Sequence, residues 1–203
     1  ALMAASISHY RSSPVVSGVG KGMKKGEEKG SGERGDKYME GLEERLQCLG
    51  WVLRHRGMRI SSRVLAQLWE MFVVSPCNER EGHAFWDWLL RLSKGVIKQG
   101  ALHAPSAELL LNKVATLDSE TMGVEEFAVF RLYFLYVNDK KGFLRIEERR
   151  GISLQIGGQL VCLEKLWSIV LQAVHKTVWQ DALSCLNGLY LSPAEDATPV
   201  PKQ

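Results

Sequence analysis

The sequence predicts an all-α fold built from stacked helix pairs, and two observations support this. Apolar residues recur at three- and four-residue steps along most of residues 38–191. A shift of 98 residues also aligns two helix–turn–helix segments without a gap: Leu65, Leu68, Trp69, Ala84, Phe85 and Trp88 fall on Leu163, Leu166, Trp167, Ala182, Leu183 and Leu186. Chance similarity between amphipathic helices is the alternative. A true repeat indicates an armadillo- or HEAT-like α-solenoid, in which stacked helix pairs bury a continuous core.

Local signals place the first three helices. Residues 38–53 carry an apolar stripe, and Asp36 precedes it as the expected N-cap. Ser61 or Ser62 is expected to cap a second helix, which ends at Ser75 because the residue before a proline is disfavoured in the helical region. Asn78 is expected to start a third helix.

Later helices are expected from Pro105, over 124–137, over 160–174 and over 178–191. Between them, 138–158 is the one stretch where strands are plausible, because 143–146 and 152–156 alternate at period two. A small hairpin and an irregular loop remain equal alternatives there.

Charge and glycine content divide the chain into three regions. The net charge of +3 lies in the residues up to Lys37, which hold seven Lys/Arg against four Asp/Glu, so the remainder balances. We expect a disordered Gly/Lys-rich head over 1–36, because such a composition buries too little apolar surface to offset ordering. The armadillo-like region is expected over 37–191, followed by a Pro-rich tail or linker over 192–203.

Composition also excludes several classes of protein. No run approaches the 18 or more apolar residues of a transmembrane helix, and the neutral body lacks the basic face of a nucleic-acid binder. Four widely spaced cysteines in apolar contexts predict reduced core thiols, hence a cytoplasmic protein. We therefore expect proteins as partners, with no membrane or nucleic acid.

Catalytic and metal chemistry find little support in the sequence. A cysteine hydrolase built on Cys185 and His175 is a third reading, but helical spacing places Cys185 among core leucines. No clustered Cys or His has the spacing of a metal site. We expect no catalytic residue, no metal and no cofactor.

Two groups of residues are candidate partner contacts. Arg54, Arg56 and Arg59 lie at the junction of the first two helices, where basic side chains also complement a helix C-terminus. Trp86 and Trp88 share a helix with Phe85, and three rings cover more than one face. We expect one of the two tryptophans to be exposed for a partner or a further repeat.

Three sequence blocks resemble the armadillo-type helical region of the very large, fat-facets-like ubiquitin-specific proteases. The first is LWEMFVVSP from Leu68, followed by FWDWL from Phe85. The second spans Leu110–Phe127, with Asp118-Ser119 in place of the usual Lys-Pro. The third is LEKLWSIVLQA from Leu163, followed by DALSCLNGLY from Asp181. The blocks consist mostly of leucine and tryptophan, so their order and spacing carry the resemblance.

The resemblance implies a non-catalytic scaffold or substrate-recruiting region of a large deubiquitinase. The cysteine box and the histidine box of that family's catalytic domain are not present in this sequence, so no catalytic residue is carried over. The implied partners are ubiquitin-pathway substrates or adaptors, together with neighbouring repeats of a longer chain. A generic HEAT/armadillo adaptor unrelated to ubiquitin is the alternative.

Overall fold

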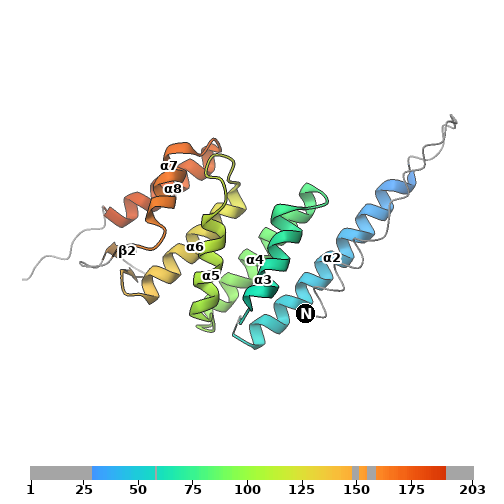
Figure 1. The fold of residues 1–203 in the computed structure, drawn as a ribbon, viewed down its shortest axis with the longest axis horizontal. Helices are drawn as coiled ribbons and strands as arrows, with labels where there is room; N and C mark the ends of the chain where they lie inside the picture. The colour runs from blue at the N-terminus through green and yellow to red at the C-terminus, as the bar shows by residue number, and fades with distance from the viewer. Residues whose placement is uncertain (1–28, 58, 148–150, 155–158, 191–203) are drawn as a thin grey trace, which may run out of the picture. The chain divides into compact units, whose positions relative to one another are not determined.

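A computed structural model describes residues 29–57, 59–147, 151–154 and 159–190, and these are predominantly helical, as predicted (Figure 1). The chain divides into two compact units, residues 1–102 and 103–203, and each is described here by itself. Of the head that was expected to be disordered over 1–36, residues 1–28 lie outside the described residues, and so does the Pro-rich tail over 192–203. For residues 29–36 the expectation is wrong, because they are helical.

Unit 1 contains α2 (Lys29–His55), α3 (Ser62–Trp69), a π-helical segment η1 (Glu70–Val74) and α4 (Glu79–Lys98). The predicted start of the first helix is wrong: α2 begins at Lys29, so residues 29–36 are helical and Asp36 is not an N-cap. Once a helix has nucleated, each added residue gains a hydrogen bond. Asp36 also forms an ion pair with Arg80 of α4, at 3.0 Å.

The predicted starts of α3 and α4 are confirmed. Ser61 Oγ accepts a hydrogen bond from the Val64 amide at 3.3 Å, and Asn78 Oδ1 accepts one from the Glu81 amide at 3.0 Å. Helix α3 continues directly into η1, and the helical stretch ends before Pro76, as expected. There the Ser75 amide donates to the Glu70 carbonyl at 2.9 Å, the five-residue spacing of a π-turn.

Helices α2 and α4 pack side by side and run in the same direction. At one end the fully buried Glu81 carboxylate accepts hydrogen bonds from the Tyr38 hydroxyl at 2.6 Å and from the Cys77 amide at 3.0 Å. Further along, Gly50 lies against the Trp88 indole: a methyl group on Gly50 would stand 3.0 Å from Trp88 Nε1. The absent side chain at Gly50 therefore lets the indole reach the backbone of α2.

Unit 2 contains α5 (Ala104–Ala115), α6 (Val124–Lys140), β1 (Leu144–Glu147), β2 (Gly151–Leu154), α7 (Leu163–Gln172) and α8 (Lys176–Tyr190). Helix α6 packs against both α5 and α8, and α7 packs against α8. Of the two alternatives for 138–158, the structure has the hairpin: β1 and β2 are antiparallel, with Leu144 opposite Leu154. They contact α6 and α8 respectively. Helix α6 itself continues to Lys140, beyond the predicted end.

Burial in the two units gives a different register from the sequence repeat. A shift of 97 residues, not 98, places seven buried positions of the first helix pair on buried positions of the second. Trp69, Phe72, Glu81, Phe85, Trp88, Leu89 and Leu92 then fall on Leu166, Ile169, Val178, Ala182, Cys185, Leu186 and Leu189. The same shift places the start of α4 on the start of α8. The aligned Leu-Trp pairs at shift 98 are therefore one position out of helical phase.

Substitution of Gly50 tests the packing of α2 on α4. We expect Gly50→Ala to lower the free energy of unfolding by about 1 kcal/mol, because the clash with Trp88 exceeds the better helix propensity of alanine. The matched control is Gly95→Ala in α4, where a methyl group meets nothing within 4 Å. It should raise the free energy of unfolding by about 0.5–1 kcal/mol in urea titrations. Equal stabilisation by both changes would contradict the close approach.

Candidate protein-interaction surfaces

Both tryptophans proposed as partner contacts are buried, so that prediction is wrong. Trp86 is 4% exposed and Trp88 is 7% exposed. The Trp86 ring meets Trp69 of α3 edge-on, with centroids 5.7 Å apart, and Trp88 lies against Gly50 of α2. Helix α4 thus packs against α3 on one side and α2 on another, so aromatic rings on both of these faces are buried. The Trp88 Nε1 hydrogen is buried without a hydrogen-bond acceptor.

The three arginines proposed as contacts are exposed, as a partner contact would require. Arg54 Nε donates to the Gly50 carbonyl at 3.3 Å, within the last turns of α2. That hydrogen bond agrees with the role of basic side chains at a helix C-terminus. Arg56 and Arg59 lie beyond the helix end.

Trp51 is an exposed aromatic residue that the sequence analysis did not single out. Its side chain is 58% exposed, and its ring lies 4.1 Å from the His55 ring, centroid to centroid. His55 Nδ1 is also 2.8 Å from the Trp51 carbonyl oxygen. The helical position of Trp51, off the Leu42/Leu46/Leu53 stripe that is buried in unit 1, is the signal that would have revealed it.

A larger apolar surface lies on the last two helices of unit 2 and is called the α7–α8 surface below. Its members are large apolar side chains exposed to solvent: Trp167, Leu171, Val174, Trp179 and Tyr190. Trp167 and Leu171 are about one helical turn apart on α7, and Trp179 and Tyr190 are about three turns apart on α8, so each pair shares a face. Val174 lies in the connection between the two helices. The Trp167 and Tyr190 rings join the two pairs, with centroids 6.5 Å apart.

The fold itself does not require an apolar side chain at the position of Trp167. In the register of 97 residues, Trp167 corresponds to the exposed Glu70 of unit 1, whereas Leu171 corresponds to Val74, which is exposed and apolar as well. A polar residue therefore serves at the position of Trp167 in an otherwise matching helix pair. Trp167 itself is 41% exposed. Exposed apolar groups that folding does not demand indicate a binding surface.

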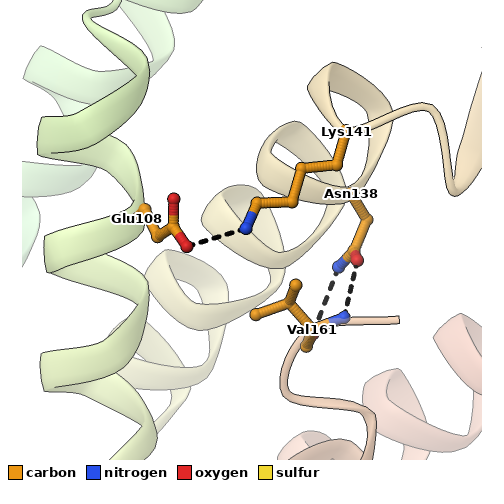
Figure 2. A network of polar contacts seen from close by, with 4 residues as sticks. All are labelled: Glu108, Asn138, Lys141 and Val161. Atoms are coloured by element: carbon orange, nitrogen blue, oxygen red, sulfur yellow. Dashed lines mark hydrogen bonds and ion pairs between the residues drawn. The ribbon is translucent and has the colours of Figure 1, made fainter. Parts of the chain in front are cut away.

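Two polar networks hold α7 in place behind this surface. Figure 2 shows the first: the buried Asn138 side chain accepts from the Val161 amide at 2.7 Å and donates to the Val161 carbonyl at 3.2 Å. Lys141, three residues on, pairs with Glu108 of α5 at 2.7 Å. The start of α7 is thereby tied to the end of α6.

The second network joins α7 to the connection between α5 and α6. Lys165 Nζ donates to the Leu117 carbonyl and to Ser119 Oγ, and Ser168 Oγ lies 2.9 Å from Ser119 Oγ. Burial lowers the pKa of Lys165, while the nearby Asp118 carboxylate acts in the opposite direction. Lys165 and Ser168 lie on a different face of α7 from Trp167, so this second network does not cover the α7–α8 surface.

The cysteines are only partly as expected. Cys185 is 1% exposed, which confirms its predicted core position, and burial raises the pKa of its thiol while Arg131 opposes that shift. His175, its partner in the hydrolase reading, is exposed. The prediction of core thiols is wrong for Cys48 and Cys77, which are exposed because they lie on the outer face of α2 and in the turn before α4. Cys162 is half-buried.

The described residues show neither a cluster of metal ligands nor a membrane-spanning helix. These residues bring together no group of three His, Cys, Asp or Glu side chains suited to a metal ion. Within the same part of the chain, every helix is too short or too polar to cross a membrane. Comparison with protein-family models and with curated proteins finds no match to this chain.

Neighbouring substitutions in α7 test which side of the helix faces solvent. We expect Trp167→Glu, which installs the residue found at the matching position of unit 1, to change the free energy of unfolding by no more than about 0.5 kcal/mol. Leu166→Ala should cost about 2–5 kcal/mol, because Leu166 is fully buried. Urea titration of the full chain measures both. If Trp167→Glu lowered the free energy of unfolding more than Leu166→Ala, Trp167 would be the buried residue, and the register of 98 residues would be correct.

Proposed function

We propose that the chain is a non-catalytic, armadillo-like scaffold that recruits protein partners within a large ubiquitin-specific protease. The α7–α8 surface is the observation that carries the scaffold role, because it exposes five large apolar side chains on α7, α8 and the connection between them. Polar contacts also hold α7 in place behind it. The assignment to a ubiquitin-specific protease rests on the three sequence blocks. A generic HEAT/armadillo adaptor is the second candidate.

The helix arrangement supports a solenoid of stacked pairs. In unit 1, α2 and α4 run parallel with α3 connecting them, as equivalent helices of successive repeats do. In unit 2, α8 packs on α6 and repeats the burial pattern of α4. Each unit thus supplies a helix that covers one face of a following helix pair.

The proposed occupant of the α7–α8 surface is an amphipathic helix of a partner protein. Trp167 and Leu171 form one apolar row on α7, and Trp179 and Tyr190 supply a second row on α8 beside it. Val174 adds an apolar side chain in the connection between the helices. A helix laid along both rows buries its own apolar stripe against two rows of side chains. Under this proposal neither Cys185 nor His175 has a catalytic role.

The test uses the full-length gene product, isolated from its cells with an antibody to residues 103–190. We expect a ubiquitin probe with an electrophilic C-terminus to label the isolated polypeptide, and ubiquitin conjugates to copurify with it. A Trp167→Glu/Leu171→Glu variant should keep the probe labelling and lose most of the conjugates, whereas Trp51→Glu should retain both.

Three outcomes would contradict the proposal. A polypeptide that stays unlabelled, in a lysate whose other cysteine deubiquitinases are labelled, supports the generic adaptor. Equal recovery of conjugates with Trp167→Glu/Leu171→Glu and with the wild type would exclude the α7–α8 surface as the recruiting site. Dimerisation lost in the same variant would instead assign the surface to a second copy of the chain.

A further inference from the structure

A second surface, on unit 1, has a different chemistry from the α7–α8 surface. It surrounds the connection between α2 and α3, and it is called the basic end below. Its members are Trp51 and the exposed arginines Arg54, Arg56, Arg59 and Arg63. From the basic end we propose that unit 1 binds a short acidic peptide segment that carries a large apolar or aromatic residue.

The charge of the basic end is not balanced by neighbouring acids. No Asp or Glu occurs from Arg45 to Trp69, a stretch that contains all four arginines. The connection packs against the end of α4: a methyl group on Gly57 would lie 2.9 Å from the Ala101 carbonyl oxygen. Residues 88–102 also lack any acid, and the last turn of α4 adds Lys98. Within the described part of the chain, none of the four arginines forms an ion pair.

Helix dipoles account for only part of this charge. Arg54 and Lys98 lie in the last turns of α2 and α4, where a positive charge is favourable. Arg63 lies in the first turn of α3, where the dipole favours an acid and the helix has none. Arg56 and Arg59 belong to no helix. The Arg56 amide still donates to the Val52 carbonyl at 3.2 Å, so the charge of Arg56 also lies at the C-terminus of α2. Arg59 and Arg63 thus place two positive charges where neither helix dipole favours them.

The exposed indole indicates that the ligand has an apolar group as well as negative charge. Trp51 precedes Arg54 by three residues and lies one helical turn before it on α2, so the two side chains are neighbours. A peptide that places an aromatic or large aliphatic side chain on Trp51 can then place a carboxylate on Arg54 and further carboxylates along the connection that follows α2. Arginine suits this role because it forms bidentate hydrogen bonds with carboxylates.

The limited extent of the basic end favours a peptide over a nucleic acid. Glu43 and Glu44 are exposed on α2, and the exposed Glu70 follows α3, so carboxylates bound the arginines on both sides along the chain. A polynucleotide with a phosphate at every step would meet these acids, whereas a few side-chain carboxylates would not. The inference rests on unit 1 alone and is independent of the proposed function.

The experiment measures binding of a fluorescent peptide to the full chain by anisotropy. The probe peptide is a glutamate-rich sequence with a central phenylalanine, and its counterparts replace every glutamate by glutamine or the phenylalanine by serine. We expect the glutamate peptide to bind, the glutamine peptide not to bind, and the affinity to fall as NaCl is raised from about 50 to about 200 mM.

Charge reversal locates the site. Arg59→Glu/Arg63→Glu should weaken binding about tenfold or more, whereas Lys140→Glu/Lys176→Glu in unit 2, with the same change in net charge, should stay within about twofold. Trp51→Ser should weaken binding of the phenylalanine peptide and leave the serine peptide unaffected. Circular dichroism checks folding, and Arg59→Gln/Arg63→Gln is the milder variant should the reversal unfold unit 1.

Several results would overturn the inference. Equal losses for the two charge-reversed pairs would show attraction by net charge alone. Tighter, arginine-dependent binding of a single-stranded oligonucleotide or of phosphatidylserine vesicles would reassign the basic end to nucleic acid or to a membrane. Absence of binding at millimolar peptide concentrations would show that the arginines only keep this surface hydrated and bind no acidic peptide.

Discussion

The buried amide of Asn138 is the interaction on which the arrangement of unit 2 depends. It is the point where the end of α6 is joined to the residue that precedes α7, across the hairpin between them. Asn138 also donates to the Phe134 carbonyl at 2.8 Å, so its side chain satisfies both backbone groups of Val161 and is itself held by α6. A buried polar group without these partners would cost about 1–3 kcal/mol. The position of α7, and with it the α7–α8 surface, follows from this amide.

The two units bury seven corresponding positions of their helix pairs but expose different chemistry. Unit 1 turns Trp69, Trp86 and Trp88 inward and presents arginines at one end. In unit 2 the corresponding core positions hold smaller residues; Cys185, for example, takes the position that Trp88 has in unit 1. The tryptophans of unit 2 are exposed to solvent. A common core pattern with unlike surfaces is what an array of helix pairs needs for contacts with more than one partner.

Local sequence signals identified the helices, whereas tertiary contacts decided which faces are exposed. The caps at Ser61 and Asn78 are confirmed because each depends on residues within one turn. The burial of Trp86 could not be predicted from local sequence, because the Trp69 ring that covers it lies on another helix. The phase of α7 was missed because the Leu-Trp pairs at 68–69 and 166–167 fit a shift of 98, although burial matches Trp69 with Leu166. For 138–158, period-two alternation fitted a hairpin and a loop equally well.

The central claim is that tryptophans of unit 2 face solvent while those of unit 1's helix pair are buried. Hydroxyl-radical footprinting of the full chain with mass spectrometry measures the accessibility of each ring separately. We expect rapid oxidation of Trp167 and Trp179 and slow oxidation of Trp69, Trp86 and Trp88. Protection of Trp167 to the level of Trp69, or rapid oxidation of Trp86, would contradict it.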